Sequence, residues 1–359
     1  MLYKLIYLFQ EDISWLNVFR YITFRTILAT LSSLLLFFFL GTWVISRLRT
    51  LQVGQFIRDD GPPNHKTKAG TPTMGGCLVL PVILFSTFFW AEPQNVYVWL
   101  VMFVILSYGL IGFGDDYLKL TRKNSQGLSV KAKFTLQIIA AFFIAVILHV
   151  YPGYNSQLNF PFLKTITPDL GIAYILLTVF VIVGTSNAVN LTDGLDGLAI
   201  GPIIVAFTSY LIFSYLAGHA RIASYLQIPY VAGTGELSIL CGAVVGAGLG
   251  FLWYNSYPAE IFMGDTGSLP LGAVLGTVAV LTKQEMVLIL VGGIFVVEAL
   301  SVIFQVTYFK ITGGHRIFRM APLHHHFELK GWPESKVTVR FWIIAIILAL
   351  ISVSTLKLR

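Results

Sequence analysis

The chain has 359 residues, of which 56% are hydrophobic and only 11% are charged, and its mean hydropathy is +0.78. This apolar excess excludes an ordinary soluble globular protein, because a soluble domain of this size does not need so much apolar surface. The net charge of +7 indicates basic loops beside anionic lipid headgroups rather than a protein that binds nucleic acid.

Long apolar segments recur along the whole chain. A helix that crosses the ~30 Å hydrocarbon core of a bilayer needs about 20 mostly apolar residues. The sequence therefore predicts an all-α polytopic integral membrane protein with about ten transmembrane helices, forming a single domain over residues 1–359. The predicted spans are 22–46, 74–91, 95–113, 133–151, 171–189, 198–217, 237–254, 267–282, 286–309 and 338–356.

Basic residues predict the orientation of these spans. Loops 47–73, 114–133 and 310–340 carry 5, 5 and 6 of the 24 Lys and Arg residues. Loops rich in Lys and Arg face the cytoplasm, and an even number of spans leaves both termini on one side. We therefore expect both termini in the periplasm and an active site on the cytoplasmic face, where the acidic motifs fall.

The segment before the second span ends in Lys-Ala-Gly-Thr-Pro-Thr-Met-Gly-Gly, residues 68–76. Pro72 disfavours helix at Thr71, and the paired glycines leave a bare backbone that a ligand can approach. An ordinary loop and helix start explain this segment equally well.

Two adjacent carboxylates, Asp115 and Asp116, end the third span. Neighbouring residues do not share one face of a helix. We therefore expect one aspartate to face a pocket while the other holds a lysine or the waters of a metal ion. Solvated acids at a helix end are the alternative.

The loop between the fifth and sixth spans repeats Asp-Gly with a period of three, at Asp193-Gly194 and Asp196-Gly197. Glycine frees backbone amides to meet an anion or the edge of a nucleobase. A turn explains one Asp-Gly pair but not the whole string, and the closing Glu of an EF-hand is absent.

Asp265 stands at the start of the eighth span and is either a helix N-cap or a metal ligand, since Asp suits both roles. A third acidic motif on the same face favours a metal ligand. Hard oxygen donors without cysteine favour Mg²⁺, with Mn²⁺ as the alternative, over zinc. Two carboxylates ~5 Å apart repel by roughly 3 kcal/mol at an effective dielectric of about 20, so a shared site needs protonation, lysines or a divalent cation.

Lysines 68, 119, 131 and 133 lie on the same predicted face. They suit a site where two phosphorylated substrates meet, although lysines at a membrane interface need no function.

Glu298 lies within the ninth span, six residues after Gly292-Gly293, a pair that can bend or break the helix. An acid at membrane depth faces the bundle interior or a polar cavity, and we expect a structural polar partner for it. The last basic loop carries His324, His325 and His326. We interpret these as donors that bind and orient phosphate, rather than as a transition-metal site.

Four strings in chain order resemble one family. Gly-Asp-Asp-Tyr (114–117), Asn-Leu-Thr-Asp-Gly-Leu-Asp-Gly (190–197), Met-Gly-Asp-Thr-Gly-Ser (263–268) and Pro-Leu-His-His-His-Phe-Glu (322–328) are similar to the polyprenyl-phosphate N-acetylhexosamine-1-phosphate transferases. The resemblance runs from Lys68 to Glu328. Strings 71–76 and 321–328 look like the muramoyl-pentapeptide branch of that family rather than the GlcNAc-1-phosphate branch.

This resemblance implies transfer of phospho-MurNAc-pentapeptide from UDP-MurNAc-pentapeptide to undecaprenyl phosphate. The products would be lipid I and UMP, the reaction would depend on Mg²⁺, and it would be the first membrane step of peptidoglycan synthesis. The resemblance also implies a multi-pass protein of the bacterial inner membrane and a homodimer. The sister activity, transfer of GlcNAc-1-phosphate, is the nearest alternative, and a cation-coupled transporter with Glu298 in its pathway is a more distant one.

The resemblance also implies roles for residues at matching positions. Asp265 would ligate Mg²⁺, Asp115 and Asp116 would handle the lipid phosphate, and His324 would support phosphate positioning. The uridine diphosphate end would be held by Asn190, Asp193, Gly194, Leu195, Asp196, Asn255 and Phe262, with Phe262 stacking on uracil. Further lining candidates are Lys68, Thr73, Lys133, Gln305, Ala321, His325 and His326.

Two mechanisms remain open from the sequence. In one, an aspartate, in the first place Asp115, deprotonates or orients the lipid phosphate for direct attack; in the other, an aspartate forms a phosphoryl-enzyme. We favour direct attack, because no carboxylate in the sequence is set apart as a nucleophile.

Overall fold

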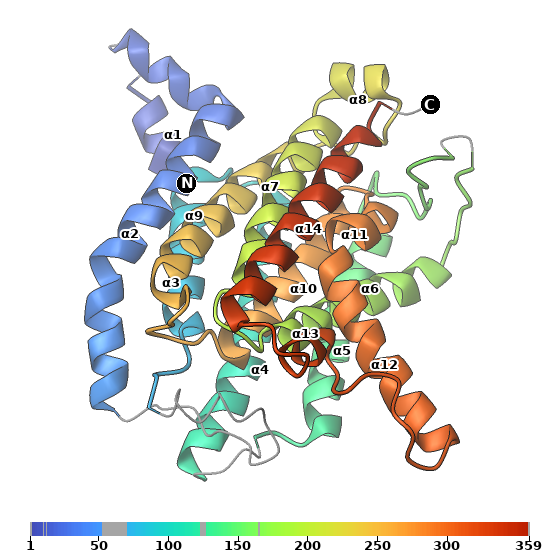
Figure 1. Cartoon of the computed structure of the whole chain (residues 1–359). Coiled ribbons are helices and arrows are strands. Elements are labelled where there is room, and N and C mark those ends of the chain that lie inside the picture. The colour runs from blue at the N-terminus through green and yellow to red at the C-terminus, as the bar shows by residue number, and fades with distance from the viewer. Residues whose placement is uncertain are drawn as a thin grey trace.

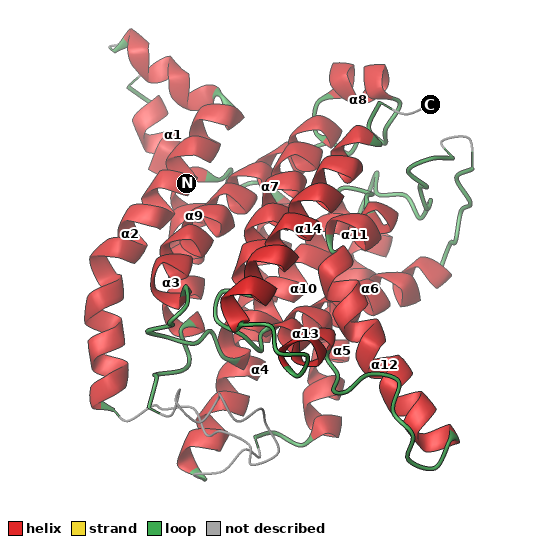
Figure 2. Ribbon diagram, in the orientation of Figure 1, coloured by secondary structure: helices red, strands yellow, loops and turns green. Residues whose placement is uncertain are grey.

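A computed structural model describes residues 2–9, 11, 13–51, 70–122, 127–163 and 166–357. Within these ranges the chain is helical, and its β-structure amounts to the isolated bridge between Gln157 and Asp169 (Figure 2). The all-α fold expected from the sequence is thereby confirmed for the described residues.

Eight helices in the described ranges are long and apolar enough to cross a membrane. They are α2 (Ile22–Thr50), α4 (Val96–Thr121), α5 (Val130–Val150), α6 (Ala173–Thr192), α7 (Ile200–Ala217), α9 (Leu237–Asn255) with the preceding turn η3 (Thr234–Glu236), α12 (Gly293–Ile311) and α14 (Glu334–Ser354). Two shorter apolar helices, α3 (Gly76–Trp90) and α10 (Asp265–Leu281), coincide with two further predicted spans. The remaining short helices are α1 (Leu2–Tyr7), η1 (Ser14–Arg20), α8 (Ala220–Leu226), α11 (Glu285–Val291) and α13 (Leu323–Glu328).

The short helix α10 forms the centre of the bundle (Figure 1). It packs against α4 and α6, and every residue from Thr266 to Leu281 is buried. A helix that is apolar all round is stable when protein covers it on all sides. Because α10 is surrounded by other helices rather than by lipid, bilayer thickness does not set its length.

The ninth predicted span is interrupted, as its glycine pair suggested. Helix α11 ends at Val291 and α12 begins at Gly293, with Gly292 between them at φ −90° and ψ 17°. A Cβ added to Gly293 would lie 2.7 Å from Cδ1 of Leu348 in α14. The glycine therefore lets α14 approach the break closely.

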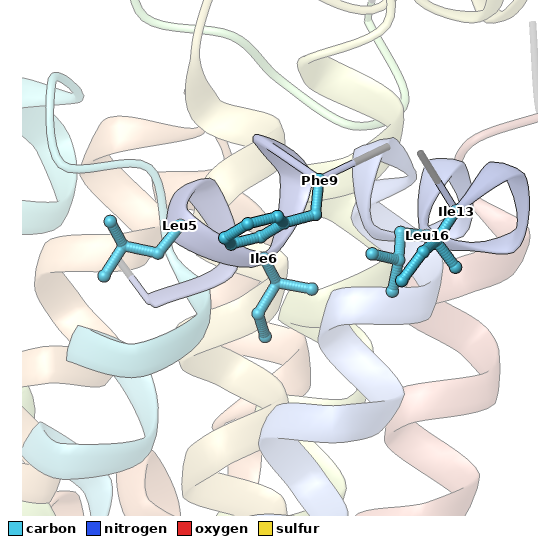
Figure 3. Close-up of a pocket in the computed structure, with 5 residues that line it drawn as sticks. All are labelled: Leu5, Ile6, Phe9, Ile13 and Leu16. Carbon is cyan, nitrogen blue, oxygen red and sulfur yellow. The ribbon is translucent and has the colours of Figure 1, made fainter. Parts of the chain in front are cut away.

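The two ends of the bundle differ in character. Both chain termini lie in the upper part of Figure 1, whereas the C-terminal end of α4 and the start of α5 lie at the bottom. Near the N-terminus, residues of α1, η1 and the segment between them line an open apolar hollow of about 370 Å³ (Figure 3). Its lining is Leu5, Ile6, Phe9, Ile13 and Leu16. This hollow lies far from the acidic motifs and offers no polar group for chemistry.

Candidate active site

Three carboxylates from two helices meet at the lower end of the bundle. Asp115 and Asp116 come from the last turns of α4, and Asp265 is the first residue of α10. One oxygen of each lies within 4.8 Å of the others. Both neighbouring aspartates therefore lie in one cluster, and the lysine contact that the sequence led us to expect for one of them is present at Asp115.

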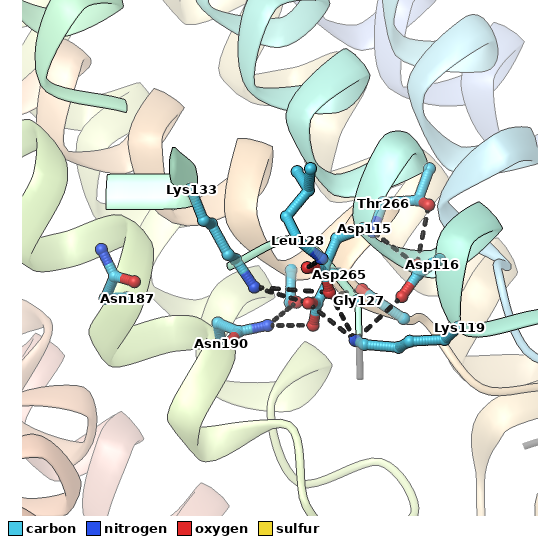
Figure 4. A network of polar contacts seen from close by, with 12 residues as sticks. Asp115, Asp116, Lys119, Gly127, Leu128, Lys133, Asn187, Asn190, Asp265 and Thr266 are labelled. Atoms are coloured by element: carbon cyan, nitrogen blue, oxygen red, sulfur yellow. Dashed lines mark hydrogen bonds and ion pairs between the residues drawn. The ribbon is translucent and has the colours of Figure 1, made fainter. Parts of the chain in front are cut away.

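Two lysines neutralise most of this negative charge, approaching Asp265 from opposite sides (Figure 4). The Nζ atom of Lys119 lies 2.6 Å from Asp115, 3.4 Å from Asp116 and 3.0 Å from Asp265. Lys133 Nζ, from the first turn of α5, lies 2.6 Å from Asp265 and 3.7 Å from Asp115. Three carboxylates and two ammonium groups leave one formal negative charge.

Two backbone N–H groups and one hydroxyl hold the two neighbouring aspartates. The backbone N–H of Leu128 donates to Asp115 over 2.9 Å. The backbone N–H and the hydroxyl of Thr266 both donate to Asp116, over 2.9 and 2.8 Å. These bonds tie the end of α4 to the start of both neighbouring helices.

Local backbone structure places Asp265 at its position. Gly264 precedes it in the left-handed region at φ +71° and occupies the N-cap, so Asp265 is a first-turn residue rather than the cap. A helix N-terminus favours a negative charge there. Asn190 Nδ2 donates to Asp265 over 2.7 Å and to the Ser268 hydroxyl over 2.8 Å, and these bonds orient the carboxylate.

The donor set fits a hard divalent cation. All three candidate ligands are carboxylates, the type that Mg²⁺ and Mn²⁺ prefer. The ammonium of Lys119 already contacts all three, so the carboxylates enclose a position suited to a cation. The protein thus contains an acidic group that can bind a metal ion.

The Asp-Gly loop, residues 193–197, follows α6 and adjoins this cluster. Asp193 comes three residues after Asn190 and its side chain is half-buried. Burial, with added repulsion from Asp265, Asp116 and Asp196, raises the pKa of Asp193 to about 7. Asp193 can therefore exchange a proton near neutral pH. Leu195 and Asp196 are buried.

His324 and Glu298 form a buried pair beside this loop. Glu298 accepts a hydrogen bond from the backbone N–H of His324 and lies 3.1 Å from its Nδ1 atom. The Nε2 atom of His324 is buried without a hydrogen-bond partner, and a Cβ at Gly194 would overlap it. Glu298 thus has the structural polar partner that we expected, and His324 turns its free nitrogen toward the loop.

The other two histidines have separate partners. His325 Nδ1 lies 2.7 Å from Glu328, and His326 Nδ1 accepts from the backbone N–H of Arg319 over 3.0 Å. Because the three Nδ1 atoms face three different partners, the string does not form a joint metal site through them.

The segment after Gly70 also reaches the site. The carbonyl of Pro72 accepts from the Phe262 N–H over 2.8 Å, and the Gly75 N–H donates back to the Phe262 carbonyl over 2.8 Å. A Cβ at Gly264 would lie 3.2 Å from the Thr73 hydroxyl. Thr73 and the half-buried Phe262 are therefore close to the acidic cluster. Lys68 lies outside the described residues.

Two predicted lining residues, Asn255 and Gln305, make side-chain hydrogen bonds to backbone groups of the protein. Asn255 accepts from the Gly197 N–H and donates to the Ile261 carbonyl. Gln305 holds the 317–318 backbone through three hydrogen bonds, and Ala321 is half-buried just before α13. Asn255 and Gln305 therefore shape the surroundings of the site.

Other contacts escaped the sequence analysis. Ser268 and Thr266 lie within the Met-Gly-Asp-Thr-Gly-Ser string, which offered a signal, whereas Leu128 contributes only backbone and offered none. Asn187, three residues before Asn190, donates to Gln137 over 2.7 Å, away from the cluster (Figure 4). Lys131 is exposed on the first turn of α5.

The chain is similar in sequence to a known family of transferases. The sequence profile of glycosyl transferase family 4 matches residues 98–283, more than half of the chain. A bundle of apolar helices with carboxylates and lysines at one end is thus the framework of a membrane-embedded transferase of this class.

Relatives named phospho-N-acetylmuramoyl-pentapeptide-transferase match over the full length of both chains. Identity is 61% to the protein of Syntrophus aciditrophicus, 59% to that of Desulforapulum autotrophicum and 58% to that of Citrifermentans bemidjiense. The chain belongs to the phospho-N-acetylmuramoyl-pentapeptide-transferase family.

Proposed function

We propose that this protein transfers phospho-MurNAc-pentapeptide from UDP-MurNAc-pentapeptide to undecaprenyl phosphate, forming lipid I and releasing UMP. The observation that carries the proposal is the gathering of Asp115, Asp116 and Asp265 with Lys119 and Lys133 at one end of the helix bundle. Transfer of a phosphoryl group chiefly requires positioning and neutralisation of charge. Membership of the family supports the substrates.

The position of the site suits a lipid acceptor. The polyprenyl chain is insoluble in water and stays in the hydrocarbon, while its phosphate must meet a soluble nucleotide. A site at the ends of α4 and α10 lies where these two substrates can meet. We place it at the cytoplasmic face of the bacterial inner membrane, because the basic loops lie on that side.

Mg²⁺ is the cofactor that we propose, held by Asp265 with Asp115 and Asp116 close by. Bound there, it would neutralise phosphate oxygens and polarise the phosphorus under attack. The cluster already carries one net negative charge, and a diphosphate adds more. A cation is therefore needed before donor and acceptor phosphates can approach each other.

For the chemical step we favour direct attack. An oxygen of the lipid phosphate attacks the phosphorus that bears the sugar and forms a new P–O bond. The bond between that phosphorus and the bridging oxygen breaks, and UMP leaves with the bridging oxygen and its negative charge. Asp115 orients or deprotonates the lipid phosphate, Lys119 and Lys133 stabilise charge on the phosphates, and His324 supports phosphate positioning. The 193–197 loop and Phe262 hold the uridine diphosphate end.

The test is exchange of radiolabelled UMP into UDP-MurNAc-pentapeptide by purified protein with undecaprenyl phosphate, with and without Mg²⁺. We expect exchange that needs both lipid and metal. Assay of UDP-GlcNAc in parallel addresses the sister activity, and a product from UDP-GlcNAc alone would refute our proposal. Labelled phosphoryl-aspartate trapped without lipid would refute direct attack.

The transporter alternative has lost its main support. It rested on Glu298 as an ion-pathway acid, but Glu298 is fully buried and bonded to His324. A homodimer remains a proposal, testable by mass measurement of the purified protein in detergent.

A further inference from the structure

One face of α14 carries three polar groups at a regular spacing. Glu334, Thr338 and Trp342 are each four residues apart, and residues spaced in this way lie on the same side of an α-helix. None of the three belongs to the motifs singled out in the sequence.

The side chains on this face form hydrogen bonds with successive backbone groups of the 193–197 loop. The Asp196 N–H donates to Glu334 Oε1 over 2.7 Å, and the Thr338 hydroxyl donates to the Asp196 carbonyl over 3.1 Å. The indole N–H of Trp342 donates to the Gly197 carbonyl over 3.0 Å. A single helix therefore holds three successive peptide groups, from the Asp196 N–H to the Gly197 carbonyl.

The loop is held from its other side as well. The Gly197 N–H donates to Asn255 over 3.0 Å, and the Ala259 N–H donates to the Asp196 carboxylate over 3.0 Å. Gly197 has φ +71°, a conformation that suits glycine. A Cβ at Gly201 would overlap the indole of Trp342, so glycine there leaves room for the tryptophan ring.

The held loop lies next to the reacting groups. It begins three residues after Asn190, which donates to Asp265, and Gly194 faces the free Nε2 atom of His324. Glycines give the loop many conformations when it is unsupported. If the loop is already ordered before the ligand binds, the conformational entropy lost on binding is smaller and the affinity is higher.

We propose that Thr338 and Trp342, with Glu334, are positioning residues that pre-form the 193–197 loop for the nucleoside diphosphate end of the donor substrate. This inference rests on the proposed function. It assigns α14 a role in donor affinity, and none in binding of the lipid acceptor.

The test compares variants that remove single hydrogen-bonding groups. Trp342→Phe deletes the indole N–H and Thr338→Val deletes the hydroxyl, while Thr338→Ser keeps the hydroxyl. The matched control is Trp99→Phe, because Trp99 also donates its indole N–H to a backbone carbonyl, that of Pro93, but at the far end of α4. Measurements are KM for each substrate, Kd for UMP by calorimetry, and the thermal midpoint.

We expect Trp342→Phe and Thr338→Val each to raise the donor KM and the UMP Kd about fivefold, the worth of one lost hydrogen bond. The lipid KM should stay constant, and Thr338→Ser and Trp99→Phe should behave as the unmodified protein. Unchanged donor KM in both variants, or a lower thermal midpoint with both KM values intact, would overturn the inference. Failure of the unmodified protein to transfer at all would refute the proposed function instead, and UMP binding would still report on the loop.

Discussion

At the scale of single residues, Asp265 lies at the centre of the polar contacts of the site. It contacts Lys119, Lys133 and Asn190, and its position at the start of α10 makes it the candidate metal ligand with the best-defined orientation. Its side chain remains at the end of the bundle rather than in the packed core. Its loss should therefore affect chemistry more than folding.

We predict that Asp265→Asn lowers turnover at least about a hundredfold and abolishes the Mg²⁺ dependence. The thermal midpoint should change little, because the amide can still accept from Asn190. Steady-state assays across a Mg²⁺ titration, with Asp169→Asn in an exposed loop as control, measure both effects. Mg²⁺-dependent turnover retained in the variant would contradict the assignment.

His324 depends on Glu298 for its orientation. The carboxylate bonds both the backbone N–H and the Nδ1 side of the ring, which leaves Nε2 facing Gly194. We predict that Glu298→Ala lowers turnover about tenfold to a hundredfold, as expected for the loss of hydrogen bonds to a charged group. Glu298→Gln, which keeps an acceptor, should lose less.

A double variant separates an indirect effect of Glu298 from a general loss of structure. If Glu298 acts through His324, then Glu298→Ala combined with His324→Ala should be no slower than His324→Ala alone. Losses that multiply would show that Glu298 acts independently of the histidine.

At the scale of elements, the site depends on the close approach of α4 to α10. Gly112 lies where the two helices touch, and a Cβ there would overlap the carbonyl oxygen of Asp265. Gly114, half a turn further along α4, has its nearest neighbour 4.0 Å from the corresponding position. The two glycines therefore differ in what they contribute to packing.

We predict that Gly112→Ala destabilises the protein by about 1–3 kcal/mol, the usual cost of overpacking, and removes most activity by shifting Asp265. Gly114→Ala should be neutral or slightly stabilising, since alanine favours helix over glycine. Thermal midpoints in detergent and turnover of the two variants provide the comparison. Equal behaviour of both would show that the contact is not needed.

At the scale of the whole molecule, the acidic cluster and both termini lie at opposite ends of the bundle (Figure 1). The described parts of the basic loops, residues 114–122, 127–133 and 310–340, lie on the side of the cluster. The positive-inside rule assigns this side to the cytoplasm. We predict that alkaline phosphatase fused after Lys357 is active in the periplasm, whereas a fusion after Gly314 is inactive. The reverse pattern would invert the proposed orientation.

Much of the architecture was predictable because it is local. A membrane helix must satisfy its backbone hydrogen bonds within its own segment, so each apolar run specifies its helix without knowledge of its neighbours. The all-helical fold and the break at Gly292 followed in this way, whereas the family was indicated by the resemblance of four motif strings. The exceptions are α3 and α10, which are shorter than a full span. Neighbouring helices bury α10, so the thickness of the bilayer does not set its length.

The sequence by itself predicted which acidic, basic and histidine side chains are candidates for the chemistry, and at which helix ends they stand. Tertiary structure alone decided that Asp116 bonds Thr266, 150 residues away, that His324 meets Glu298 and Gly194, and that α14 holds the Asp-Gly loop. Those partners depend on how the helices pack side by side. Contacts between residues distant in sequence arise from the packing of whole helix faces, and a short sequence motif does not specify that packing.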